Sequence, residues 1–356
     1  MAAAPRPALN AASAPASALD GGPARRRVVL GSALVLLGLA LLGVMLFQRQ
    51  APLAELPYTY RPVAATPVEA LQRLVELVPD GRIELAQLVA NPTDQPVATL
   101  ARLHRPGRTP ALVEWRNALA EPVLYQDIDA AEELRLVEAL RDHLPPGSTV
   151  YALPALSDRL AMLLDLDLPL AAAGDRATLR VPEPWLRAEA AIRASEAERN
   201  GRTGGEAADT AFAAFTAALL AEEAQGVARL TLMSGGREAF IILHLQDLFA
   251  LGTAYPHDIA VGLHDFPAGG QVHDQARLVK SWISDNGHAA YAVLPRGKGV
   301  MRVLFLTEPS ATGTLVAQLL PFNTARIGST AGLRLVFQHR GYWVYSLGPL
   351  TATTED

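Results

Sequence analysis

The longest uninterrupted apolar stretch of the chain covers residues 28–47. It contains no charged residue, and only Ser32 and three glycines interrupt it. At about 1.5 Å per residue, a helix of this length reaches about 30 Å, which matches the hydrocarbon core of a bilayer. A buried helix in a soluble protein is the alternative, but such a helix rarely lacks a polar face over this length. The pattern therefore predicts one transmembrane anchor, which we assign to residues 25–49.

Basic residues on the two sides of this stretch predict its orientation. Arg25, Arg26 and Arg27 lie directly before it, whereas Arg49 and Arg61 are the basic residues in the chain just after it. Because the more basic flank of a transmembrane helix stays in the cytoplasm, we expect a cytoplasmic N-terminus and a periplasmic C-terminal domain at the bacterial inner membrane.

A cleaved signal peptide is the alternative interpretation of the same pattern. The exit from the apolar stretch, at residues 48–52, reads QRQAP and offers no small-x-small cleavage site, so the sequence favours a retained anchor. Residues 1–24 are mostly Ala, Pro and Ser, which is typical of a disordered cytoplasmic tail. Prolines recur every five residues within residues 50–66 and at Pro67, which indicates an extended, semi-rigid linker.

Residues 67–181 alternate between helical and strand-like patterns and are interpreted as an N-terminal α/β subdomain. Apolar stripes predict helices over residues 67–78 and 129–143, and a further helix opens at Ser157 and runs to residue 164. Residues 80–128 are interrupted by prolines and are predicted to form short strands, for example at residues 111–115 and 123–126. A further strand is predicted at residues 149–153.

Residues 182–226 differ in composition and predict a helical hairpin. A helix rich in Ala, Glu and Arg begins at Pro184 and ends at Asn200, and a Gly-rich turn leads to a second helix. Phe212, Phe215 and Leu219 share one face of that second helix. Two interpretations stay open: a packed pair that shields a sheet, or a projecting arm that docks a partner.

Residues 227–350 are rich in strands and form the predicted C-terminal α+β subdomain. Three hairpins are expected, over residues 230–243, 290–306 and 333–347, with a further strand at residues 259–263 and helices at residues 271–284 and 313–320. The expected fold is therefore α+β, a mixed sheet with flanking helices, preceded by one N-terminal transmembrane helix.

Charge and cysteine content narrow the range of functions. Once the five Arg and one Asp of the first fifty residues are set aside, 26 basic and 35 acidic residues remain, a net charge near −9. This charge argues against nucleic acid as a partner and favours a basic protein surface. The chain has no Cys, which excludes disulfides, thiolate-held iron–sulfur clusters and haem attached through Cys-x-x-Cys-His. We therefore expect no cofactor of these kinds.

Catalytic motifs are missing, but one group of residues is a candidate site. The chain has no nucleophile elbow, phosphate-binding loop, zinc-protease motif or dinucleotide fingerprint. Five of its eight His lie between residues 244 and 288, and three of these begin His–Asp pairs. Imidazole with carboxylate is suited to metal binding or to acid–base chemistry. The pairs are His257 with Asp258, His264 with Asp265, and His273 with Asp274.

Ordinary structural roles are the alternative for these pairs, because Asp commonly caps helices and turns and the spacings match no metal signature. Tyr342 and Trp343 lie at the tip of the last expected hairpin. Aromatic residues anchor protein interfaces, so this tip is a candidate partner contact.

Parts of the C-terminal subdomain resemble the hydroxylamine oxidation protein HaoB family. The resemblance rests on residues 255–267, 272–283, 303–307 and 319–322, and the anchor and length are similar too. It implies a periplasmic protein encoded with a multihaem hydroxylamine oxidoreductase in ammonia- or methane-oxidising bacteria. It implies partnership with that enzyme and supplies no catalytic residues.

Three functions follow from these observations. The first is a membrane-anchored periplasmic accessory protein of hydroxylamine oxidation that binds the oxidoreductase, carries no haem and is not itself an enzyme. The second is a membrane-bound metal-dependent enzyme that uses the His–Asp residues. The third is an exported small-molecule binding module.

Overall fold

The computed structural model describes residues 37–38, 54–171, 173, 179–201, 205–297, 299–322 and 327–348. Residues 1–53 and residues 54–356 form two compact units. The predicted anchor lies outside the described residues except for Leu37 and Gly38, which are helical. Within the described ranges, no helix has the length and apolar character needed to cross a bilayer. The anchor and the N-terminal tail therefore stay predictions.

The first sheet of residues 54–356 is an antiparallel meander. Its strands are β1 (Tyr58–Pro62), β2 (Arg82–Ala90), β3 (Gln95–His104) and β4 (Ala111–Asn117), and they pair in the order β1-β2-β3-β4. Strands β2 and β3 are longer than the short, Pro-interrupted strands that we expected in this region. Residues 123–126 were expected as a strand, but they contribute only a single bridge, between Leu124 and Arg180.

Strand β1 corrects part of the predicted linker. Tyr58 to Pro62 pair with β2 along the whole strand, so these residues belong to the folded unit. The side chain of Tyr58 is buried in the core beneath the sheet, and its hydroxyl donates to Glu196 at 2.6 Å. The proline spacing indicated an extended backbone, which is correct, but burial of Tyr58 holds that backbone in the sheet.

The central sheet has the order β10-β11-β6-β5. Its members are β5 (Val150–Tyr151), β6 (Ala239–His244), β10 (Leu333–His339) and β11 (Tyr342–Leu347). Strand β5 runs parallel to β6, and the other pairs are antiparallel, so the sheet is mixed. It joins a strand of the predicted N-terminal subdomain to strands of the predicted C-terminal one, and thus crosses the boundary that we expected between them.

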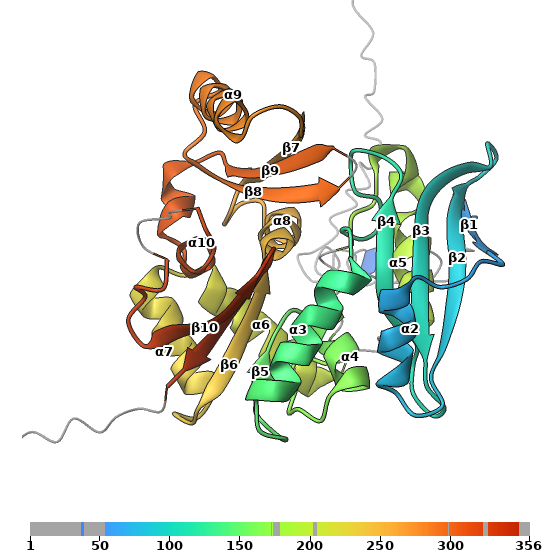
Figure 1. Cartoon of the computed structure of the whole chain (residues 1–356), viewed down its shortest axis with the longest axis horizontal. Helices are drawn as coiled ribbons and strands as arrows, with labels where there is room; N and C mark the ends of the chain where they lie inside the picture. Colours follow the sequence, from blue (N-terminus) through green and yellow to red (C-terminus); the bar gives the residue numbers. More distant parts are fainter. Residues whose placement is uncertain are drawn as a thin grey trace, which may run out of the picture. The chain divides into compact units, whose positions relative to one another are not determined.

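Helices cover both faces of the central sheet (Figure 1). On one face lie α3 (Ala130–His143) and α4 (Pro154–Leu163), which share a core with α2 (Glu69–Glu76) and the near face of the first sheet. The sequence predicted α2 and α3 to within two residues at each end. Helix α4 begins three residues before the expected Ser157, with Pro154 in its first turn, where proline is favourable.

A third, three-stranded sheet has the order β7-β9-β8. It contains β7 (Val261–Pro267), β8 (Ala290–Gly297) and β9 (Val300–Leu306). Helix α9 (Val272–Asp285) covers its outer face (Figure 1) and buries Val279 and Ile283 against Val303 and Phe305. The other face packs on α8 (Leu245–Ala254) within the largest core. The expected hairpin and helix are confirmed here, whereas α8 was not predicted.

The helices after residue 182 correct two predictions. They are η1 (Glu183–Ala188), α5 (Glu189–Arg199), α6 (Glu206–Leu219) and α7 (Glu223–Met233). Helix α6 packs chiefly against α7, which ends where we expected the first strand of a hairpin.

The expected pairing of α5 with α6 is therefore wrong. Ile192 of α5 lies in the core of the first sheet, whereas Phe212 and Phe215 of α6 lie in the core of the central sheet. The last elements, η2 (Pro309–Gly313) and α10 (Leu315–Leu319), complete the central core. The α+β class is confirmed, with three sheets in place of one.

Candidate functional site

A cavity of about 490 Å³, called the main cavity below, opens at the carboxyl ends of the parallel strands β5 and β6. Ligand sites in α/β sheets favour this position, because the chain leaves each strand there and enters a helix. Helix α4 follows β5 and helix α8 follows β6. The lining residues include Leu153, Ala155, Arg159, His244, Arg302 and Tyr342.

His244 forms part of the cavity wall and caps α8. Its Nδ1 accepts the backbone N–H of Gln246 at 3.2 Å, and its own backbone N–H donates to the Asp247 carboxylate at 2.7 Å. Burial, together with the nearby positive charge of Arg159, lowers the pKa of His244 to about 3. The imidazole is therefore neutral at physiological pH, and since Nδ1 accepts a hydrogen bond, Nε2 carries the proton.

Gly341 allows the imidazole of His244 to sit in this place. A Cβ atom at position 341 would lie 2.1 Å from His244 Nε2, so any side chain there would displace the ring. The ring centroid of His244 lies 4.5 Å from that of Tyr342, the first residue of β11. The turn between β10 and β11 thus fixes both side chains.

A buried ion pair lies behind Tyr342. Nε of Arg159 on α4 donates to both carboxylate oxygens of Glu133 on α3, at 2.6 and 2.7 Å, and Nη1 donates to the Ala155 carbonyl at 3.0 Å. The guanidinium of Arg159 also interacts electrostatically with the Tyr342 phenol. Burial, and then the negative charge of Glu133, raise the pKa of Tyr342, so the phenol keeps its proton.

The opposite wall contains Arg296, Arg302 and Asp127. Asp265 does not line the cavity but pairs with both arginines. Arg302 of β9 donates to Asp265 of β7 from Nε at 2.8 Å and from Nη2 at 3.0 Å, and it is 1% exposed. Arg296 of β8 donates to Asp127 at 2.7 Å and to Asp265 at 3.1 Å. Burial alone would raise the pKa of Asp265, but the hydrogen bonds and charges of Arg302 and Arg296 outweigh burial and lower it.

This network joins the third sheet to the loop that follows the first sheet. Arg296 also donates to the carbonyls of Asn117 and Leu119, and Arg302 donates to the carbonyl of Ala120 at 2.6 Å. One nitrogen, Nη1 of Arg302, has no hydrogen-bond acceptor among the described residues and lies 3.7 Å from Asp127 Oδ2. The described residues therefore satisfy nearly all, but not all, of the hydrogen-bonding groups of these two arginines.

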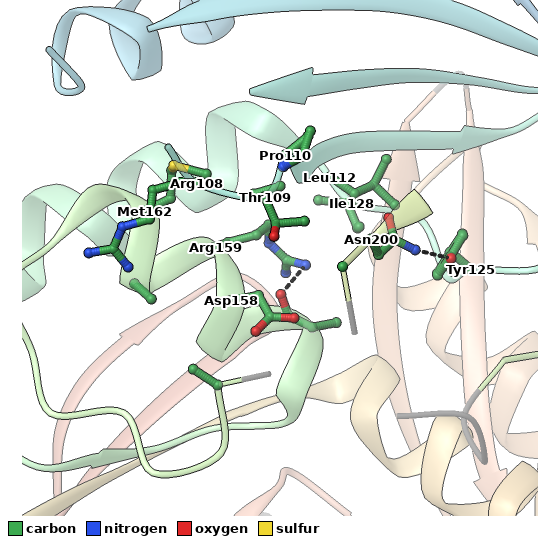
Figure 2. A pocket seen from close by; sticks show the side chains of 15 residues that line it. Arg108, Thr109, Pro110, Leu112, Tyr125, Ile128, Asp158, Arg159, Met162 and Asn200 are labelled. Atoms are coloured by element: carbon green, nitrogen blue, oxygen red, sulfur yellow. Dashed lines mark hydrogen bonds between the residues drawn. The ribbon is translucent and has the colours of Figure 1, made fainter. Parts of the chain in front are cut away.

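A smaller cavity of about 180 Å³ adjoins the main cavity, and Tyr125, Ile128, Ala155 and Arg159 line both. Figure 2 shows Asn200 pointing toward Tyr125, and its Nδ2 donates to the Tyr125 hydroxyl at 2.6 Å. The Tyr125 hydroxyl donates in turn to Glu196 at 2.9 Å. The inner wall is thus held by a hydrogen-bond chain that ends at a buried carboxylate.

The structure places the three predicted His–Asp pairs in separate roles. His257 and Asp258 lie exposed in the turn before β7, and His273 and Asp274 lie exposed in the first turn of α9. Within the described part of the chain, which includes all six residues, no three His, Cys, Asp or Glu side chains are placed to hold a metal ion.

The side chains of the third pair, His264 and Asp265, lie on opposite faces of β7. His264 stacks on Trp282 of α9, with 4.6 Å between ring centroids, while Asp265 faces the arginines of the cavity wall. Successive residues of a strand point to opposite faces, so a sequence-adjacent pair on β7 cannot act at one point. Asp265 is the member that reaches the site, and it does so as an ion-pair partner.

The structure does not support the candidate partner contact at Tyr342 and Trp343, because both side chains are buried. They are 5% and 7% exposed, because β11 lies between β10 and β6 and is covered on both faces. They therefore do not form an exposed contact for a partner. Tyr342 instead belongs to the main cavity, and the indole N–H of Trp343 is buried with no acceptor among the described residues.

Apart from Asp265, sequence reasoning missed the charged residues of the site, since no motif marks them. Arg302 offers one usable signal, because it interrupts the apolar run of β9, VMRVLFL. Glu133 and Arg159 lie on helix faces that are otherwise apolar. A charge inside an apolar run is expensive to bury unless it is paired, so such positions indicate ion pairs.

A family model described as HaoA-associated protein HaoB matches residues 24–347. No curated protein and no solved structure matched the chain.

Proposed function

The chain belongs to the HaoB family of HaoA-associated proteins, and from this membership we propose that it is a membrane-anchored periplasmic accessory protein that binds a multihaem hydroxylamine oxidoreductase. The match to residues 24–347 is the observation that carries the proposal, and it confirms the resemblance found in the C-terminal residues. The family places the protein in hydroxylamine oxidation, the chemistry of nitrification, in an accessory role.

Sequence features support the finer parts of the proposal. The three arginines before residues 28–47 favour a cytoplasmic N-terminus. The domain formed by residues 51–356 would then lie in the periplasm. The absence of Cys from the whole chain means that any covalently attached c-type haem belongs to the partner. We propose no catalytic activity and no cofactor for this chain.

Anchoring would raise the occupancy of a weak complex. Confining two proteins to a thin layer at the membrane raises their effective concentration, so a contact with a dissociation constant of about 10⁻⁵ M is well occupied. The net charge near −9 of residues 51–356 suits a basic surface on the partner. Charge complementarity of this kind sets the association rate, and salt screens it.

Capture from native membranes tests the proposal. The full-length chain with an affinity tag should retain a hydroxylamine oxidoreductase at about 20 mM salt and lose most of it at about 500 mM, where the Debye length falls below that of physiological salt. Haem absorbance and mass spectrometry identify the captured protein. If no oxidoreductase is retained at either salt concentration, the proposed partnership is wrong.

Two half-exposed leucines provide a matched pair of variants for this assay. Leu186 lies on η1 and is 51% exposed, whereas Leu119 lies in the loop after β4 and is 50% exposed. Leu186→Glu is expected to lower capture several-fold if η1 contacts the partner, because buried interface positions tolerate no unpaired charge. Leu119→Glu should leave capture unchanged.

A further inference from the structure

The lining of the main cavity contains hydrogen-bond donors without an acceptor among the described residues, whereas each of its carboxylates already accepts a hydrogen bond or forms an ion pair. Asp127 accepts from Asn117 and Arg296, and Asp247 accepts from the backbone of His244. Asp129 caps α3 by accepting two backbone N–H groups, and Glu132 pairs with Arg340 at 3.5 Å. Each carboxylate that lines the cavity therefore already has a donor.

Three donors in the same lining have no acceptor among the described residues. Among the described residues, neither the Tyr342 hydroxyl nor the protonated Nε2 of His244 has a hydrogen bond to an acceptor. Nη1 of Arg302 is the third. Unsatisfied donors in a largely buried wall cost free energy, which an acceptor-rich ligand recovers.

Apolar side chains form another part of the lining, which also includes polar residues such as Arg116, Gln126 and Gln246. Leu153 is the N-cap residue of α4 and Leu156 lies in its first turn, Ala250 lies on α8, and Leu294 and Val300 come from β8 and β9. A volume of about 490 Å³ lies within the range of small-molecule sites. An inorganic anion would leave these walls uncovered, whereas a carboxylate on an apolar skeleton covers them and satisfies the donors.

We propose that the main cavity binds a small organic carboxylate, whose oxygens accept hydrogen bonds from Tyr342 and His244 beside the guanidinium of Arg302. Arg159 and Glu133 position the phenol from behind. This binding is separate from the proposed partnership and does not depend on it.

Calorimetric titration of the full-length chain with matched probes tests the proposal. Benzoate and hexanoate carry the carboxylate, and benzamide and hexanamide have the same skeletons without the charge. Hydrogen bonds to a charged acceptor are the stronger ones, so each carboxylate should bind with at least tenfold higher affinity than its amide. Equal affinities within each pair, or no saturable binding of either carboxylate, would overturn the proposal.

Two variants locate the binding without removing packed volume. Tyr342→Phe deletes the hydroxyl, and His244→Asn keeps a capping side chain for α8 while removing the Nε2 donor. Each should weaken benzoate binding about tenfold, as expected for loss of one hydrogen bond to a charged group.

Tyr345→Phe is the control. Its hydroxyl is also buried, but it donates to the Leu319 carbonyl and Tyr345 does not line the main cavity. Circular dichroism confirms that each variant is folded before titration. Tyr345→Phe should bind benzoate as the unmodified chain does. If Tyr342→Phe and His244→Asn also bind benzoate as the unmodified chain does, the site lies elsewhere and the assignment fails.

Discussion

The side chains of the cavity wall show how a carboxylate near a His can have a purely electrostatic role. Asp265 follows His264 in sequence, which made it a candidate for acid–base chemistry, yet it accepts hydrogen bonds from Arg302 and Arg296. Both arginines hold its pKa low despite burial, so it remains ionised at physiological pH. A carboxylate held in this way cannot exchange a proton near neutral pH.

Replacing Asp265 should therefore destabilise the fold. Asp265→Asn removes the charge that compensates the almost fully buried Arg302, and loss of one partner of a buried ion pair costs about 3 kcal/mol in the free energy of unfolding. Urea denaturation measures this loss. Asp258→Asn, at the exposed member of another pair, should change stability by less than about 0.5 kcal/mol. A stable Asp265→Asn variant would show that the ion network does not hold the wall.

His244 should make stability depend on pH. Its pKa in the folded chain is about 3, below the ordinary value of 6.5. Between pH 3 and pH 6.5 the imidazole is therefore protonated in the unfolded chain and neutral in the folded chain. Stability should fall as pH falls from 6.5 toward 3, by up to about 1.4 kcal/mol per pH unit.

The variant His244→Asn isolates this contribution, because Asn keeps a cap and does not titrate. Urea denaturation of both proteins at pH 7.0, 6.0, 5.0 and 4.5 gives the comparison. The unmodified chain should lose stability more steeply than the variant. Parallel curves would mean that His244 titrates normally in the folded chain.

At the scale of elements, helix packing depends on one close approach that the sequence pattern does not reveal. Gly226 lies within α7, where α6, α7 and α10 meet, and a Cβ there would lie 2.5 Å from the Ala218 carbonyl and 2.7 Å from Leu315. Glycine is unfavourable within a helix by about 1 kcal/mol, so its presence here indicates a packing requirement.

Gly226→Ala should destabilise the chain despite the better helix propensity of Ala. Overpacking of this kind costs about 2 kcal/mol, and thermal unfolding should show a lower midpoint. Gly313→Ala is the matched control, because a Cβ at this exposed position meets nothing within 4 Å. An unchanged or raised midpoint for Gly226→Ala would mean that α6 and α7 separate at little cost.

At the scale of the whole molecule, the orientation of the chain in the membrane is the premise of the proposed partnership. The arginine asymmetry predicts that alkaline phosphatase fused to the C-terminus of the full-length chain is active, because this enzyme folds in the periplasm. A green fluorescent protein at the same place, exported unfolded, should be dark. Bright fluorescence with inactive phosphatase would place residues 51–356 in the cytoplasm and remove access to a periplasmic oxidoreductase.

The sequence determined the features that depend on local pattern. The stripes of α2, α3 and α9, the β8–β9 and β10–β11 hairpins and the α+β class could all be predicted, because amphipathic periodicity and turn residues act over a few positions. Helix α8 was missed because it is buried almost all round and shows no polar stripe. Family membership was also readable, from four short stretches.

Only the tertiary structure decided which elements meet. Placing β5 beside β6 and burying Tyr342 depend on contacts between residues far apart in the chain. The main cavity arises in the same way: Glu133, Arg159, His244, Arg302 and Tyr342 come from five different elements. The local sequence pattern determines which face of a helix or strand becomes buried. Which other element covers that face depends on how all the helices and strands pack together.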